Sequence, residues 1–346
     1  MSCYHPVKVC YSKSYFAKTG KKIIHQLLQS DTNEAKIINA NNYPKTLYEY
    51  IYIPCGKCVG CRSDNAKMWS IRAIKEFKMH TDNVFITLTY DDNSSVVEDD
   101  PLCLCSLRYK HFQNFMKRLR KSSGSQIRYL VCGEYGTKNG RAHFHAILFG
   151  FRFPDMVLHH IDDKGIRHYS SEMLQNAWSK DGIPIGFVDL SDVTEGACNY
   201  VSGYVLKKLD VFDDSPIITY VDRYGEEQHL PLSDRCPPMV RSSRRPGIAG
   251  DWYKKYGKRF VEGSPLAYVS SDHSTVHKVP VPRYFKNLYE KEYPEEYKTI
   301  KKCNEEKMKE YYKRNPLDLK ALEVKEESHL YRIFCKVKDV LTRHAL

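Results

Sequence analysis

The most informative segment of the chain, residues 141–150, reads Arg-Ala-His-Phe-His-Ala-Ile-Leu-Phe-Gly. In a β-strand alternate side chains project from the same face, so His143 and His145 would point together while Phe144 faces the other way. Two neutral imidazoles on one face make half of a metal site. The alternative is a strand with two solvated or core-bonded histidines, and His-x-His by itself would favour it. The neighbouring segments decide between the two.

A second β-rich segment lies just upstream and ends in a carboxylate. Residues 129–136 read Tyr-Leu-Val-Cys-Gly-Glu-Tyr-Gly, and Asn139-Gly140 is a strong hairpin-turn signal between the two segments. If the strands pair antiparallel, Glu134 lies opposite the histidines. Two imidazoles and one carboxylate leave positions open for water or a phosphate, which is typical of a catalytic divalent-metal site. The alternative for Glu134 is a solvated hairpin residue.

A third segment predicts a helix over residues 194–209. Thr194 suits the N-cap, and Tyr200 and Tyr204, four residues apart, would lie on one face about 6 Å apart along the axis. Lys207 and Lys208 follow one turn later. Tyrosines at this spacing usually pack against a core, which is the alternative. However, a phenol with a pKa of about 10 needs a nearby cation to become a nucleophile at neutral pH, and the lysine pair would provide one.

Taken together, these segments resemble the HUH endonucleases, a superfamily of rolling-circle replication initiators with relaxases and transposases as relatives. The order and spacing of Phe85–Tyr90, His143–His145 and Tyr200–Lys208 are most similar to the two-tyrosine initiation proteins of Microviridae, the gokushovirus-like single-stranded DNA phages. Residues 55–62, 133–136 and 243–247 are also similar to segments of that family. The resemblance covers roughly residues 50 to 260.

The resemblance implies a metal-dependent nuclease that cuts viral DNA at its origin. A tyrosine would attack the scissile phosphate, remain joined to the 5′ end, drive rolling-circle replication and later reseal unit-length single-stranded circles. Bound Mg²⁺ or Mn²⁺ would polarise the phosphate. The site residues that it implies are Glu134, His143 and His145 for the metal, and Tyr200, Tyr204, Lys207 and Lys208 for catalysis.

Partners and location follow from the same resemblance. Single-stranded DNA and origin double-stranded DNA are the expected partners, a host helicase and polymerase are candidate further ones, and the cytoplasm of an infected bacterium is the expected location. Two other functions stay open: a relaxase or transposase of the same superfamily, and a non-enzymatic, zinc-stabilised DNA-binding protein. The second would form no covalent product with DNA.

Three cysteines, Cys55, Cys58 and Cys61, form a C-x2-C-x2-C pattern that suits a tetrahedral ion and needs one more ligand. Cys3, His5 and Cys10 are the candidates for that ligand. We expect Cys3, because little else would order the N-terminal arm. Structural Zn²⁺ is favoured over an iron–sulfur cluster, since Asn65 stands where the fourth cysteine of that motif would be. Both are favoured over idle thiols.

Composition agrees with a polyanionic partner. The formal net charge is +12, and 26 tyrosines are interleaved with Lys and Arg, as on surfaces that bind single strands. A solvated basic surface is the alternative. No apolar run of 18 residues predicts a membrane span, and the segment after Met1 has no apolar core of a signal peptide.

The expected fold class is α+β. A central antiparallel sheet with the ferredoxin/RRM-like β-α-β-β-α-β core of HUH endonucleases fits the element order, with helices on one face. We expect three regions: a Cys-rich, irregular N-terminal arm over residues 1–62 with a short helix near Ile23–Gln29, a catalytic core over residues 63–210, and a basic, partly helical region over residues 211–346. A basic loop at residues 239–247 is a candidate phosphate clamp.

Overall fold

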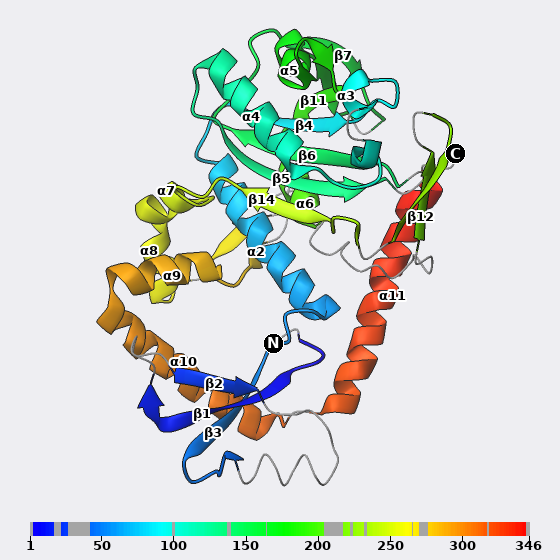
Figure 1. The fold of residues 1–346 in the computed structure, drawn as a ribbon. Coiled ribbons are helices and arrows are strands. Elements are labelled where there is room, and N and C mark those ends of the chain that lie inside the picture. Colours follow the sequence, from blue (N-terminus) through cyan, green and yellow to red (C-terminus); the bar gives the residue numbers. More distant parts are fainter. Residues whose placement is uncertain are drawn as a thin grey trace. The chain divides into compact units, whose positions relative to one another are not determined.

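The computed structural model contains two compact units, which Figure 1 shows in ribbon form. Unit 1 comprises Met1–Asp64 and Lys309–Leu346, and unit 2 comprises Asn65–Met308. The structure describes the whole chain except residues 1–2, 17–21, 27–41, 99–100, 137–139, 164, 204–216, 222–223, 232–233, 265, 270–275, 317 and 344–346. The three regions expected from the sequence, with boundaries at residues 62/63 and 210/211, stay a prediction.

Unit 2 is built on a seven-stranded sheet with the order β14-β5-β6-β4-β11-β8-β7. Every neighbouring pair is antiparallel. The strands are β4 (Asn83–Thr89), β5 (Arg128–Tyr135), β6 (Ala142–Phe149), β7 (Val157–Ile161), β8 (Arg167–Ser170), β11 (Val188–Asp192) and β14 (Met239–Ser242). The predicted antiparallel sheet and the β5–β6 hairpin are therefore confirmed.

Helices cover both faces of this sheet (Figure 1). One core packs α4 (Tyr109–Ser123) and α5 (Glu172–Ala177) against side chains such as Phe144 of β6. The other packs α2 (Val59–Phe77) and α6 (Glu195–Gly203) against the opposite side of β5 and β6, at residues such as Ile147. The expectation of helices on one face was wrong, because the second half of β6, residues 146–149, is apolar and buried on both faces of the sheet.

The N-terminal arm is not irregular in its described part. β1 (Val7–Phe16) pairs antiparallel with β2 (Lys22–Gln26) on one side and with β3 (Tyr48–Ile53) on the other. The helix expected near Ile23–Gln29 was wrong for residues 23–26, which are a strand. Adjacent β-branched residues at Ile23 and Ile24 favour extended backbone, and pairing with β1 satisfies its polar groups.

The remaining elements are short hairpins, short helices and two long helices. A third core surrounds Trp252 and Phe285 and joins α7 (Gly250–Trp252), the π-helical turn Tyr253–Gly257, α8 (Lys258–Glu262) and α9 (Arg283–Glu292). The long helices are α10 (Pro294–Arg314) and α11 (Leu319–Arg343), as expected for a partly helical C-terminal region. The other elements are α3 (Ser95–Glu98), the 3-10 turn Pro101–Cys103, β9 (Ser179–Lys180), β10 (Ile183–Pro184), β12 (Ile217–Val221), β13 (Glu227–Pro231), β15 (Ala267–Val269) and β16 (Val276–Lys278). Among the described residues, no helix has the length and apolar character to span a membrane.

Candidate metal centre and nucleophile

Two strands, β5 and β6, bring the predicted metal ligands together at one end of the sheet. The β5–β6 register places Glu134 opposite His143 and Cys132 opposite His145. The Oε1 atom of Glu134 lies 2.8 Å from Nε2 of His143 and 3.0 Å from Nε2 of His145. Glu134 is buried, and the two imidazoles are largely shielded from solvent. The carboxylate and both Nε2 atoms thus converge, as the hairpin predicted.

The other nitrogen of each imidazole is held by a partner that orients the ring. Nδ1 of His143 lies 3.0 Å from the carbonyl oxygen of Arg141, which can only accept, so this nitrogen donates. Nδ1 of His145 lies 2.9 Å from Oγ1 of Thr87 on β4, the residue paired with it across the sheet. A bonded Nδ1–H leaves Nε2 with the lone pair that a metal requires.

This arrangement fits a divalent metal ion. Two imidazole nitrogens and a carboxylate oxygen, all within 4.8 Å of one another, form a donor set that suits Mg²⁺, Mn²⁺ or Zn²⁺. Three protein ligands leave coordination positions for water or a phosphate oxygen. The identity of the metal remains a prediction.

Tyr200 lies beside this centre. Its ring centroid is 5.4 Å from that of His145 and 6.3 Å from that of Phe85, which itself stacks on His145. Helix α6 positions it: Oγ1 of Thr194 accepts a hydrogen bond from the Ala197 N–H at 3.1 Å, as the N-cap prediction requires. Tyr200 is 46% exposed, so its side chain is accessible from solvent.

The other predicted catalytic residues cannot be placed. Tyr204, Lys207 and Lys208 lie outside the described residues, which end in this region at Gly203. Their roles stay predictions.

Two residues near the metal centre were not assigned a role from the sequence. Thr87 orients His145. Phe85 stacks on the ring of His145 and meets the ring of Tyr200 edge-on. The sequence predicts a central strand over Phe85–Tyr90, which β4 largely is, and leaves Thr87 and Thr89 as candidates for contacts with DNA or with the metal centre. The signal that points to them is the period of two: Phe85, Thr87 and Thr89 share one face, and antiparallel pairing of β4 with β6 sets that face beside the histidines.

The four predicted cysteines of unit 1 also converge. Sγ of Cys55 lies 3.9 Å from Sγ of Cys61, and Sγ of Cys58 lies 3.9 Å from Sγ of Cys3. Zn–S bonds of about 2.3 Å in a regular tetrahedron place sulfurs about 3.8 Å apart. Cys10, the other cysteine considered as fourth ligand, lies within β1, opposite Tyr50 of β3. The geometry therefore fits a four-sulfur ion site that includes Cys3.

Backbone amides donate to sulfurs of this cluster and favour the thiolate at Cys58, whereas burial raises the pKa of the Cys3 and Cys61 thiols. The N–H of Tyr4 donates to Sγ of Cys58 at 3.4 Å, and that of Cys55 donates to Sγ of Cys3 at 3.2 Å. Burial raises the pKa of the Cys58 thiol, but hydrogen bonds from the N–H groups of Cys61 and Tyr4, with others, lower it to about 6. A thiolate is the form that binds a metal.

The fold and the site define an α+β protein with a three-ligand metal centre beside an exposed tyrosine. The family model of the replication-associated protein ORF2 matches residues 83–209, which contain all of these side chains. The chain is 30% identical over 269 residues to the replication-associated protein VP4 of Bdellovibrio phage phiMH2K. The aligned segment covers 75% of this chain and 74% of that protein.

Two further relatives carry similar names. The replication-associated protein ORF2 of Spiroplasma virus 4 is 29% identical over 86% of this chain and 83% of its own length, and ORF4 of Chlamydia phage 1 is 28% identical over 69% and 54%. The chain belongs to the family of Microviridae replication-associated proteins. No solved structure matches it significantly.

Proposed function

We propose that this chain initiates rolling-circle replication by cutting single-stranded DNA at the phage origin with Tyr200. The observation that supports this most directly is the contact of Tyr200 with His145, a residue of the Glu134–His143–His145 centre. A nucleophile beside a metal centre with open positions is the arrangement that phosphoryl transfer requires. Membership of a replication-associated family supports DNA as the substrate.

In the proposed reaction the Tyr200 oxygen attacks the scissile phosphorus. A bond forms between that oxygen and phosphorus, the bond from phosphorus to the 3′-oxygen breaks, and the DNA 5′ end stays on the protein as a phosphotyrosine ester. The phenol releases its proton, and the departing 3′-oxygen takes one up. Mg²⁺ or Mn²⁺, held by Glu134, His143 and His145, would supply Lewis-acid polarisation of a non-bridging phosphate oxygen.

The ester preserves the energy of the phosphodiester, so a later 3′-hydroxyl can reverse the step and reseal the strand. We assign the second cut, on the regenerated origin, to Tyr204, with Lys207 or Lys208 favouring the phenolate. Two nucleophiles allow one to hold DNA while the other cuts, which releases unit-length circles. Host helicase and polymerase are proposed partners, and Zn²⁺ is the proposed ion of the four-cysteine cluster.

The strand order β5-β6-β4-β11, with α4 between β4 and β5 and α5 between β6 and β11, supports assignment of a ferredoxin-like core. The metal centre would then lie on the two central strands of that core and one neighbour. This assignment is consistent with the HUH superfamily and places the proposed chemistry on rigid elements.

The test is covalent capture of DNA. Purified protein is incubated with labelled single-stranded phage genome, with and without Mn²⁺, and the products are separated on denaturing gels. We expect a metal-dependent DNA–protein adduct from the wild type, a strongly reduced adduct from Tyr200→Phe, and none from Tyr200→Phe/Tyr204→Phe. Tyr256→Phe, which alters a tyrosine with a comparable exposed fraction of 40%, is the matched control and should leave the adduct unchanged.

The outcomes separate the candidate functions. Tight DNA binding with no adduct would overturn the nuclease and favour the zinc-stabilised binding protein. An adduct whose DNA is transferred into a second duplex, without release of circles, would favour a relaxase or transposase. An adduct that survives in the double variant would show that other residues are the nucleophiles.

A further inference from the structure

A turn with two exposed arginines follows the edge strand β14 of unit 2. Residues 243–247 read Ser-Arg-Arg-Pro-Gly, and a backbone bridge joins Arg244 to Gly247. The N–H of Ser243 donates to the carbonyl of Tyr129 at 3.0 Å, and its Oγ accepts from the Tyr129 N–H at 3.0 Å. These bonds extend the β14–β5 pairing to the start of the turn. The Arg244 and Arg245 side chains point into solvent.

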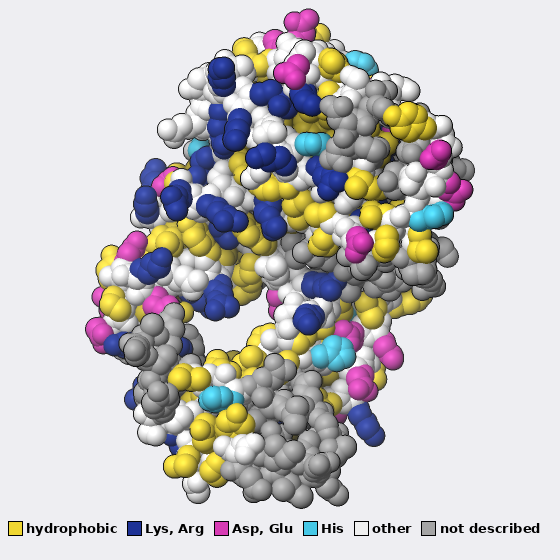
Figure 2. Space-filling model, viewed as in Figure 1, with side chains coloured by type: hydrophobic (Ala, Val, Ile, Leu, Met, Phe, Trp, Pro, Cys, Tyr) yellow, Lys and Arg dark blue, Asp and Glu magenta, His cyan; other side chains and the backbone are white. Residues whose placement is uncertain are grey.

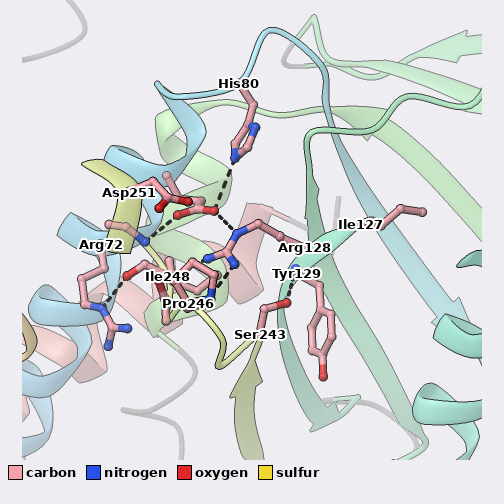
Figure 3. A network of polar contacts seen from close by, with 12 residues as sticks. Arg72, His80, Ile127, Arg128, Tyr129, Ser243, Pro246, Ile248 and Asp251 are labelled. Atoms are coloured by element: carbon pink, nitrogen blue, oxygen red, sulfur yellow. Dashed lines mark hydrogen bonds and ion pairs between the residues drawn. The ribbon is translucent and has the colours of Figure 1, made fainter. Parts of the chain in front are cut away.

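The base of the turn is fixed by a buried ion pair, drawn in Figure 3. Glu76 of α2 is buried, pairs with the guanidinium of Arg128 on β5, and accepts the N–H of Ala249 at 2.5 Å. Arg128 in turn donates to the carbonyl oxygens of Pro246 at 2.9 Å and Gly247 at 3.2 Å. One carboxylate and one guanidinium thereby bind three of the four residues from 246 to 249.

A second arginine, Arg72 of α2, completes the base of the turn. Nε of Arg72 donates to the carbonyl of Ile248 at 3.1 Å, and its guanidinium lies between the rings of Trp69 and Tyr284, at 4.2 and 4.1 Å from their centroids. A Cβ at Gly247 would lie 2.7 Å from the Tyr284 hydroxyl, so a larger residue at this position would displace the Tyr284 ring of α9.

Such a network is a poor way to gain stability. A buried ion pair recovers little more than the cost of removing two charges from water, and apolar residues of the same volume often serve as well. Its clear effect is to give the backbone of residues 246–249 a single geometry. Arg244 and Arg245 directly precede this fixed segment, and Arg244 is bridged to Gly247, which points to a positioning role for the base.

The surroundings of the turn are positive. Arg241 of β14 is also exposed. Burial raises the pKa of the Tyr109 phenol, and the positive charges of Arg241 and Arg244 oppose this shift. Figure 2 shows Lys and Arg side chains gathered over α4, β14 and α7 of unit 2. Within the described part of the chain, no ion pair joins Arg244 or Arg245 to an acidic group. Arginine forks without an acidic partner suit phosphate oxygens, which they bind in pairs.

We propose that Arg244 and Arg245 bind two phosphates of the DNA backbone next to the scissile site. The inference rests on the proposed function in taking DNA as substrate. Tyr129, which anchors the turn, and Glu134 of the metal centre lie on the same strand, β5, about 17 Å apart at 3.4 Å per residue. That length equals roughly five nucleotides along one strand of a duplex. The bound segment is either a duplex flank or the single strand.

The experiment measures DNA affinity of the full chain as a function of salt. Wild type, Arg244→Ala/Arg245→Ala and the control Lys301→Ala/Lys302→Ala bind labelled single-stranded and duplex origin oligonucleotides across a range of salt concentrations. The control removes the same charge from two adjacent exposed residues of α10. We expect the arginine variant to lose about 10- to 30-fold in affinity at 0.15 M salt, with a slope of log K against log salt shallower by about 1.4 to 1.8.

The control should lose less than about threefold, and equal melting temperatures would show that all three proteins are folded. A loss confined to duplex assigns the turn to the flank, and one confined to the single strand assigns it to the cut strand; both support the proposal. A loss no larger than that of the control, on both DNAs, would overturn it. Adduct formation is scored separately: its absence from the wild type would overturn the nuclease but not a salt-slope change that is specific to the arginines.

Discussion

At the scale of single residues, the candidate metal centre depends on a side chain and a backbone carbonyl that would not touch the metal. His145 points its Nε2 toward Glu134 because Nδ1 is bonded to Thr87, and His143 does so because Nδ1 donates to the Arg141 carbonyl. Without these bonds each ring could rotate or change tautomer, and the lone pairs would no longer converge.

Thr87→Val tests this orientation. The change keeps the shape of the side chain and removes the hydroxyl, so the concentration of Mn²⁺ that gives half-maximal DNA adduct should rise about 10-fold. Thr89→Val is the matched control, since Thr89 lies on the same face of β4 but donates to the Phe187 carbonyl at 3.1 Å. Equal shifts in the two variants would show that the strand, rather than the bond to His145, is what matters.

At the scale of elements, short helices of unit 2 depend on polar groups at their first turns. The N–H of Leu174 in α5 donates to Oγ of Ser171 at 3.0 Å, and that hydroxyl donates to Oδ1 of Asp155 at 2.6 Å. The N–H of Met173 donates to the other carboxylate oxygen at 2.8 Å. Burial raises the pKa of Asp155, but these hydrogen bonds lower it more, so it lies below its usual value.

Asp155→Asn should therefore lower the free energy of unfolding by about 1 kcal/mol at neutral pH. A carboxyl group whose pKa is lowered by folding stabilises the protein above its unfolded pKa of about 3.9, and the effect is lost as the pH falls through the folded value. The difference between wild type and variant, followed by urea unfolding at several pH values, should vanish in strong acid. Asp163→Asn, at an exposed position, should change stability little at any pH.

At the scale of the whole molecule, the chain holds two sites of different chemistry, one in each unit. The four sulfurs of unit 1 would close a four-coordinate site, which is typical of a structural ion, whereas the three ligands of unit 2 would leave positions open. A net charge of +12 favours a polyanion such as DNA as a partner. In the turn of residues 243–247, the backbone that carries two of these positive charges, Arg244 and Arg245, is held in a fixed position.

Metal analysis of the purified chain tests the closed site. Without chelator during purification, we expect about one zinc ion per chain, because the four sulfurs are already spaced for it. Cys58→Ser should lose most of this zinc and lower the melting temperature, whereas Cys303→Ser, at an exposed position of α10, should retain it. Iron in place of zinc would favour an iron–sulfur cluster. A purified chain without zinc or iron would contradict the metal site.

The sequence by itself determined the ligands and their pairing. His143 and His145 share a face because a strand repeats every two residues, and Asn139-Gly140 predicts a hairpin that sets Glu134 opposite them. Such local rules depend on spacing alone. The α+β class and the cysteine cluster followed in the same way.

Only the tertiary structure decided what surrounds those ligands. Phe85 and Thr87 come from β4, whose place beside β6 depends on long-range pairing that no local pattern encodes. The same holds for the helices on the second face, for the pairing of Ile23 and Ile24 in β2, and for the base of the arginine turn. There Glu76 and Arg128, far apart in sequence, meet because α2 packs against the face of the sheet that carries Leu130 and Cys132.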